Sequence, residues 1–312
     1  MPHRNSNIPK KYVEKLYLNG LNGRLLTLPG PKKGRDILLV YGHHSSLERI
    51  YGIAEVLADY GTVTVPDLPG FGGMDSLHKI DINADFDSLA DYLAAFIKSK
   101  YKNKKFTLAA FSIGFAITTR MLQKYPEIAK DVELLISVAG FSKRDDFKLS
   151  KKIQLFYRTL SKFFSRKSTA LFFRYVALNS WILKFFYRHT PNAKHKFKGL
   201  DSEIFNHYIN FEVELWHNND VRTYMQTTYT MLTCDLTKDK VNLPVHHVSI
   251  GDSDQYFNNN NVEKHLKQIY KSCSVEHANL DSHMPSVIAT KEEAAALLPK
   301  STRKVLGRKA VK

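Results

Sequence analysis

The sequence predicts an α/β fold built on a mostly parallel, doubly wound sheet. Short apolar runs of strand length alternate with segments of helical periodicity along most of the 312 residues. The runs are continuously apolar, as expected for strands that are buried on both faces of a parallel sheet. Between 142 and 236 the strand pattern stops and only helical periodicity continues, which predicts an inserted helical subdomain. The predicted parts are a core in two pieces, 1–141 and 237–299, a helical cap, 142–236, and a basic tail, 300–312.

The chain is expected to open with a hairpin and then alternate strands with helices. Residues 12–18 and 24–28 should pair as antiparallel strands, because the segment between them carries two Asn-Gly steps. The next expected elements are a strand at 36–41, a helix at 47–60, a strand at 62–65, a turn-rich loop at 66–73 and a helix at 86–97.

The second half of the sheet also alternates strands with helices, both before and after the insertion. Before it we expect a strand at 106–110, a helix from Ile113 that ends before Pro126, and a strand at 134–139. After it we expect a strand at 245–250, a helix at 262–270 and a strand at 274–278. A last helix should start near Thr290, because Thr290-Lys291-Glu292-Glu293 matches a capping box.

The net charge of +16 comes from two segments. Residues 147–200 hold thirteen Lys/Arg and no Asp or Glu, and 300–312 hold six Lys/Arg and no acid. The rest of the chain therefore carries 16 − 19 = −3. The basic tail is expected to be disordered.

The lack of a signal-peptide pattern and the spacing of the two cysteines favour a cytoplasmic protein. The first residues, MPHRNSNIPKK, have no apolar stretch typical of a signal peptide. The most hydrophobic window, 170–187, is interrupted by Arg174 and Lys184, which argues against a membrane span. Cys234 and Cys273 lie far apart in no metal or redox spacing, so we expect free thiols.

The most informative motif lies where the strand at 106–110 meets the following helix. Ala110-Phe111-Ser112-Ile113-Gly114 matches the GxSxG nucleophile elbow, with alanine at the first glycine position. A sharp turn of this kind needs small residues two before and two after the serine. The alternative interpretation is that Ser112 is an ordinary helix N-cap.

Further motifs follow other predicted strands, and together they resemble the α/β-hydrolase superfamily over residues 24–298. The segments that carry the resemblance are VYGHHSS, PDLPGFGG, FSIG, GDSD and DSHMP, in this order. In that family the helical insertion forms a cap or lid over the site. The resemblance implies a serine hydrolase that needs neither a cofactor nor a metal.

The resemblance also implies a catalytic triad of Ser112, Asp254 and His283. Ser112 would attack an acyl carbon, His283 would accept and return its proton, and Asp254 would orient the imidazole. The aspartate of the triad has several alternatives in this sequence. Asp252 is a local competitor, Asp145 and Asp146 are more distant alternatives, and an aspartate in this loop can simply form a turn.

The oxyanion hole is expected from the backbone N–H groups of His43 and Ile113. Many relatives have His-Gly where this chain has Tyr41-Gly42, so the bracing hydrogen bonds of that histidine are absent in their usual form. We interpret the side chains of His43 and His44 as polar loop residues, with lining of the site as the alternative. Asp67 resembles a structural position of the family and is expected to hold a turn.

The predicted activity is hydrolysis of carboxylic esters through an acyl-serine intermediate, as in a carboxylesterase or lipase. Family members that are haloalkane dehalogenases or epoxide hydrolases use aspartate at the elbow, so Ser112 argues against both. Thioesterase and carbon–carbon hydrolase activities are alternatives, as is a catalytically silent binding protein. The expected substrate is a small apolar acyl ester.

The basic insertion also contains thirteen Phe, Tyr and Trp between residues 147 and 200. One interpretation is a cap whose aromatic residues form its own core and the roof of the acyl site, with solvated Lys and Arg. The other is peripheral contact with an anionic membrane surface through the basic cap and tail. Nucleic acid is not an expected partner, because no recognised binding motif accompanies the charge.

Overall fold

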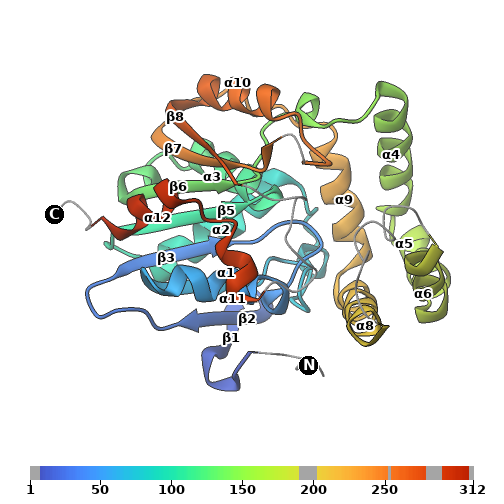
Figure 1. Ribbon diagram of the computed structural model, residues 1–312. Coiled ribbons are helices and arrows are strands. Elements are labelled where there is room, and N and C mark those ends of the chain that lie inside the picture. Colours follow the sequence, from blue (N-terminus) through green and yellow to red (C-terminus); the bar gives the residue numbers. More distant parts are fainter. Residues whose placement is uncertain (1–7, 190–201, 252–253, 279–289, 309–312) are drawn as a thin grey trace.

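The computed structural model describes residues 8–189, 202–251, 254–278 and 290–308. Within them one sheet of eight strands has the order β1-β2-β4-β3-β5-β6-β7-β8 (Figure 1). β1 pairs with β2 and β2 with β4 in antiparallel fashion, and all later pairs are parallel. The predicted α/β class and mostly parallel sheet are therefore confirmed. The strands are β1 (Val13–Leu18), β2 (Leu21–Leu28), β3 (Arg35–Val40), β4 (Gly61–Pro66), β5 (Phe106–Phe111), β6 (Val132–Val138), β7 (Val241–Ser249) and β8 (Tyr270–His277).

The opening hairpin turns more tightly than the sequence analysis expected. β2 begins at Leu21, opposite Leu18, so only Asn19 and Gly20 form the turn. Both have positive φ, 51° and 84°, as a two-residue hairpin turn of type I′ requires. The second Asn-Gly step, Asn22-Gly23, is part of β2 instead.

Helices cover both faces of the sheet. The crossover through α1 (Leu47–Ala58) runs in the opposite direction along the sheet to those through α2 (Phe86–Lys100), α3 (Ile113–Lys124) and α10 (Asn259–Ile269). Because such crossovers are right-handed, α1 lies on one face and the other three on the opposite face. α11 (Lys291–Ala295) packs beside α1, and Thr290 and Glu293 form the predicted capping box.

In the part of the chain that the structure describes, five helices lie between β6 and β7. They are α4 (Lys151–Phe164), α5 (Lys167–Val176), α6 (Ser180–His189), α8 (Ser202–Asn218) and α9 (Val221–Met231). Figure 1 shows α9 between the sheet and α4, with α4, α5 and α6 at the edge of the molecule away from the sheet. These helices share a small apolar core of their own, which includes Leu178, Ile209 and Val213.

The prediction of a disordered tail is wrong for residues 300–307, which form α12 (Lys300–Gly307). Leu306 is buried, and the N–H groups of Ser301 and Thr302 donate to the Glu276 carboxylate at 3.2 and 3.0 Å. At the other end, Arg35 donates to the Leu306 carbonyl oxygen at 3.0 Å. An anion at the N-terminus and a cation at the C-terminus of a helix both stabilise it, and neither partner is near the tail in sequence.

None of the helices that the structure describes is long and apolar enough to cross a membrane. The hydrophobic window at 170–187 is divided between two short helices, α5 and α6.

Candidate active site

The backbone at Ser112 makes a sharp turn between β5 and α3. Its φ of 48° and ψ of −118° lie in a region that residues with a side chain rarely adopt. Such a conformation costs of order 1–3 kcal/mol and persists only where surrounding structure imposes it. Here every residue of β5 is buried, and the Ser112 N–H donates to the Val138 carbonyl oxygen of β6 at 3.1 Å. The Ser112 side chain makes no capping hydrogen bond to α3, which argues against the simple N-cap interpretation.

The residues around Ser112 are small because backbone packs closely against them. A Cβ atom at Gly114 would overlap the carbonyl oxygen of Tyr41 and lie 2.7 Å from that of Val40. A Cβ atom at Gly42 would lie 3.4 Å from the Cβ of Ser112. The loop after β3 therefore runs directly beside the serine. Ala110 is fully buried in β5, so alanine fits at this position of the motif.

Two backbone N–H groups next to Ser112 are available as donors. That of Ile113 is the first in α3, where no preceding turn of helix supplies an acceptor. That of His43 follows Gly42 in the loop beside the serine. Within the described residues, neither N–H group has a hydrogen-bond acceptor. Unpaired N–H groups at a helix start are suited to binding an anionic oxygen.

Tyr41 braces the loop that carries His43, a role that the sequence analysis assigned to no side chain. Its hydroxyl donates to Asp67 Oδ1 at 3.3 Å and accepts from the Leu68 N–H at 2.6 Å. Burial raises the pKa of the Tyr41 phenol well above its usual value, so the hydroxyl keeps its proton. The Asp67 carboxylate thus acts on this loop through the Tyr41 hydroxyl. Arg24 of β2 adds an ion pair to Asp67 Oδ2 at 2.8 Å, and one to Glu48 at 2.6 Å.

The His43 side chain joins this loop to the inserted helices. Its Nε2 lies 2.9 Å from Thr227 Oγ1 of α9. Thr227 Oγ1 also lies 2.8 Å from the Thr223 carbonyl oxygen, so the hydroxyl links the imidazole to the backbone of α9. The ring also packs on Tyr224, with centroids 4.2 Å apart. Burial lowers the pKa of His43 to about 3, with a smaller contribution from His44, so the imidazole is neutral.

His44 makes a second connection, to α8. Its Nε2 lies 3.3 Å from Glu212, which also pairs with Arg49 of α1 at 3.3 Å. Glu212 is only 1 % exposed. Asn219, at the end of α8, accepts from the Gly72 N–H at 3.0 Å. The interpretation of His43 and His44 as loop residues without a specific role is therefore wrong. Their partners lie far along the chain, and no sequence signal connects them.

Asp254 lies five residues after the end of β7 and is 2 % exposed. Its Oδ1 accepts from the N–H groups of Tyr256 and Phe257 at 2.8 and 3.2 Å, so it forms a turn as any aspartate here could. β5, β6 and β7 are parallel neighbours, which puts the residues that follow them at one edge of the sheet. Ser112 and Asp254 both lie at this edge. Asp252 and His283 lie outside the described residues.

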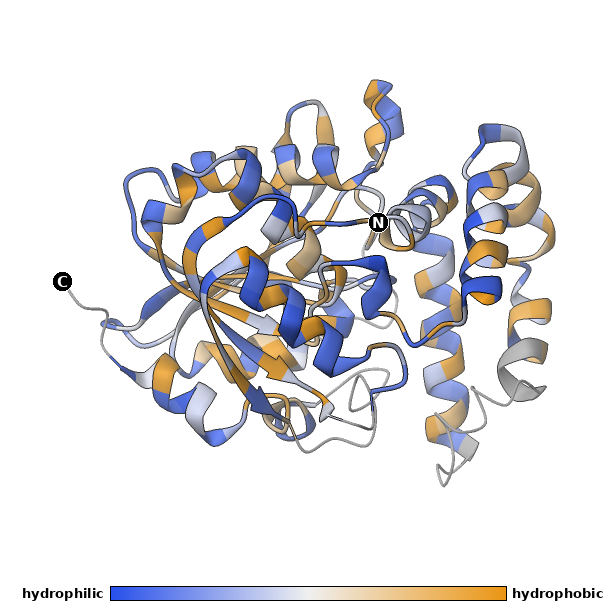
Figure 2. Ribbon diagram, turned by 90° about the horizontal axis from the view of Figure 1, so that it is seen from above, coloured by the Kyte–Doolittle hydropathy of each residue, from blue (hydrophilic) through white to orange (hydrophobic). Residues whose placement is uncertain are grey.

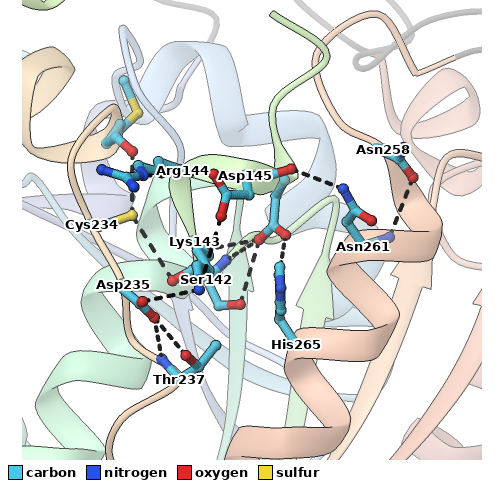
Figure 3. A network of polar contacts seen from close by, with 12 residues as sticks. Ser142, Lys143, Arg144, Asp145, Cys234, Asp235, Thr237, Asn258, Asn261 and His265 are labelled. Atoms are coloured by element: carbon cyan, nitrogen blue, oxygen red, sulfur yellow. Dashed lines mark hydrogen bonds and ion pairs between the residues drawn. The ribbon is translucent and has the colours of Figure 1, made fainter. Parts of the chain in front are cut away.

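Asp145 and Asp146 are the more distant candidates for the triad aspartate. The contacts of their loop, which follows β6, connect it to α10 (Figure 3). Asp146 is fully buried, and its Oδ2 accepts from the N–H groups of Ser142 and Lys143 at 2.8 and 2.9 Å. Its Oδ1 lies 2.5 Å from Nδ1 of His265. Asp145 is exposed, and its backbone carbonyl accepts from Asn261. Both oxygens of Asp146 thus have structural partners.

The residues described contain no group of three or more His, Cys, Asp and Glu side chains that could hold a metal ion. Cys234 and Cys273 are both free, as predicted. Burial raises the pKa of the Cys273 thiol to about 11, so neither the charge state nor the surroundings suggest a reactive thiolate.

Comparison with known proteins agrees with this geometry. The family model described as serine aminopeptidase, S33, matches residues 31–283. No curated protein sequence matches significantly.

Among solved structures, an esterase from Thermogutta terrifontis has a TM-score of 0.58 at 16 % identity, covering 95 % of this chain and 100 % of its own. An epoxide hydrolase from Bacillus megaterium reaches 0.65 at 15 % identity, covering 94 % and 99 %. The N-formylmaleamic acid deformylase of Pseudomonas putida S16 reaches 0.58 at 19 % identity, covering 87 % and 94 %. At identities below 20 %, the comparison shows that these structures and this chain have the same fold. Together with the family match, the sheet order and the serine on its turn after β5, they establish that the chain belongs to the serine aminopeptidase (S33) family of α/β-hydrolases.

Proposed function

We propose that the protein is a serine hydrolase that cleaves carboxylic esters through an acyl-serine intermediate. The observation that carries the proposal is the strained turn at Ser112, at φ 48°, beside two N–H groups without an acceptor in the described structure. Strained backbone conformations are concentrated at functional sites. In this family, a strained turn at the end of a central strand presents the nucleophile.

In the proposed reaction, His283 removes the proton of the Ser112 hydroxyl as its oxygen attacks the acyl carbon. The carbonyl π electrons move to the oxygen, which accepts hydrogen bonds from the N–H groups of Ile113 and His43. When the carbonyl reforms, the bond to the leaving alkoxide breaks and His283 gives it the proton. Water then repeats the sequence on the acyl-serine and releases the acid. Asp254 orients the imidazole and stabilises its protonated form.

The same proposal gives two of the inserted helices a role at the acyl site. α8 and α9, which contact the loop of His43 and His44, would form the wall and roof of the acyl site. This supports treating 142–236 as a cap whose packing selects the acyl group. The expected substrate is a small apolar acyl ester, and the expected location is the cytoplasm.

Related acyl compounds are the second candidates. Thioesters, amides and carbon–carbon bonds can be cleaved by the same serine, and the description of the matched family names an aminopeptidase. We do not propose epoxide hydrolysis from the epoxide hydrolase neighbour, because the elbow here carries serine rather than the aspartate expected for epoxide opening.

Fluorophosphonate labelling of the purified protein tests the nucleophile. The wild type should be labelled at Ser112, and Ser112→Ala should not be labelled. A panel of p-nitrophenyl esters of increasing acyl length, with acyl thioesters and aminoacyl p-nitroanilides beside them, then identifies the bond. Labelling at another residue, or equal ester turnover by Ser112→Ala, would contradict the proposal.

A further inference from the structure

Helix α4 exposes its apolar side to solvent instead of burying it. Ile153, Phe156, Leu160 and Phe163 recur at the spacing of one helical stripe, yet each is between 37 % and 61 % exposed. The one buried residue of α4 is Ser161. A helix that packs only on its own protein normally does the reverse, so the apolar stripe of α4 is available to something else.

The neighbouring helices α5 and α6 continue this surface. Of sixteen exposed large apolar side chains in the described residues, twelve lie between 153 and 185. This concentration defines one surface, which we call the outer face. Its members are Ile153, Leu155, Phe156, Tyr157, Leu160, Phe163, Leu171, Phe172, Tyr175, Val176, Trp181 and Phe185. Figure 2 shows the alternation of apolar and hydrophilic residues along these helices.

The charge around the outer face has one sign. Residues 151–185 contain eight Lys/Arg and no Asp or Glu. Among the described residues, none of these eight forms an ion pair, whereas core cations such as Arg24, Arg120 and Lys124 have acidic partners. Aromatic and aliphatic side chains flanked by unpaired cations are the composition that binds an anionic lipid surface.

A cavity of about 300 Å³ beside α4 adds a more specific feature. Arg144, Lys151 and Arg158 line it together with Asp145, Gln154 and Leu155. Arg158 Nε is buried and has no hydrogen-bond partner in the described structure. An unsatisfied guanidinium N–H in a cavity with three cations and one acid is suited to an anionic phosphate group.

We propose that the outer face docks on an anionic phospholipid bilayer, with the apolar side chains in the acyl boundary and the cations, Arg158 among them, on lipid phosphates. α12, the described part of the tail, lies at the opposite end of the molecule from α4, α5 and α6 in Figure 1, so we assign the contact to the outer face alone. Docking does not depend on the hydrolase activity.

Vesicle flotation of the full chain tests this proposal. Vesicles of phosphatidylcholine alone are compared with vesicles containing about 30 % phosphatidylglycerol, at low and at physiological salt. We expect at least about tenfold tighter binding to the anionic vesicles, weakened as salt rises. Ser112→Ala should bind as the wild type does, which separates docking from catalysis.

Two matched pairs of variants locate the surface. Phe156→Ser with Phe172→Ser should weaken binding at least about tenfold, whereas Tyr17→Ser with Ile82→Ser, exposed on the core, should not. Lys152→Glu with Lys162→Glu should weaken it by a similar factor, whereas Lys32→Glu with Lys33→Glu changes the net charge equally and should have little effect. Unchanged hydrolysis of a soluble ester would show that each variant is folded.

Several results would overturn the proposal. One is equal binding to neutral and anionic vesicles, and another is binding that the Phe156/Phe172 pair does not alter. A third is a wild-type dimer in solution that this pair dissociates while vesicles remain unbound, since the outer face would then contact a second copy. Tighter binding to an oligonucleotide than to anionic vesicles would assign the charge to nucleic acid instead.

Discussion

Helices α8 and α9 differ from α4, α5 and α6, although all five come from the same insertion. The inner pair presents buried polar side chains, Glu212 and Thr227, to the loop beside Ser112. The outer three present exposed apolar side chains and cations that form no ion pair with another described residue. The inner helices are therefore bound to the core by specific hydrogen bonds, while the outer helices carry an apolar surface that is exposed among the described residues. The two groups also differ in charge: 151–185 contain eight Lys/Arg and no acid, whereas α8 contains three Glu and no Lys or Arg.

The largest expected effect concerns the residue that the inner helices surround. Ser112→Ala should lower kcat/KM for an ester by at least about 10⁴-fold, because the hydroxyl is the proposed nucleophile. The loss is measured with purified protein on the best p-nitrophenyl ester. The midpoint of urea unfolding should not fall, since the Ser112 side chain makes no capping hydrogen bond. A variant that kept its activity would place the nucleophile elsewhere.

Removing the charge of Glu212 should break the attachment of the inner helices. Glu212→Gln leaves Arg49 without its buried partner, and loss of one member of such a pair costs about 3 kcal/mol in the free energy of unfolding. Urea unfolding followed by circular dichroism measures it. Ester turnover should fall as well, because the loop with His43 loses a contact. Glu203→Gln, at the exposed start of the same helix, is the control and should change stability by less than about 0.5 kcal/mol.

Two buried imidazoles should also make the fold sensitive to acid. Burial lowers the pKa of His43 to about 3 and that of His247, in β7, to about 4, against 6.5 for an exposed imidazole. Between these values the unfolded chain binds more protons than the folded one, so the free energy of unfolding falls as pH falls from about 6.5 toward 4. The urea midpoint measured from pH 7 to pH 4.5 should show this decrease.

His247→Asn separates the two imidazoles. The variant removes one titrating group and can keep a hydrogen bond to Ser137, so its stability should depend less steeply on pH than that of the wild type. A pH profile with the same slope in both proteins would show that His247 is not one of the groups responsible.

The sequence predicted what depends on local pattern and failed where distant residues meet. Continuous apolar runs identified the strands, the Ala110–Gly114 motif identified the turn at Ser112, and Thr290 to Glu293 identified a capping box that the structure contains. The partners of His43 and His44 could not be predicted, because they are separated from these residues by 184 and 168 positions. α12 was missed for the same reason: Glu276 and Arg35, which hold its two ends, come from β8 and β3.

The exposure of the outer face was also beyond the sequence, because helical periodicity shows that a stripe exists but not which way it points. A matched pair of neighbours on α5 provides the smallest and most direct test. Phe172 is 62 % exposed, whereas Phe173 is partly buried and packs on Phe164 with ring centroids 4.8 Å apart. Phe173→Ser should lower the free energy of unfolding by about 2 kcal/mol, roughly half the cost for a fully buried phenylalanine.

Phe172→Ser should change the free energy of unfolding by less than about 0.5 kcal/mol, because the side chain is already largely in water. Both values come from urea unfolding without lipid, at a protein concentration low enough to exclude self-association. Equal losses for the two variants would mean that Phe172 is covered in solution, and the outer helices would then pack as the inner ones do. If the outer face of α5 contacts a surface outside the chain, only Phe173→Ser should lower the free energy of unfolding.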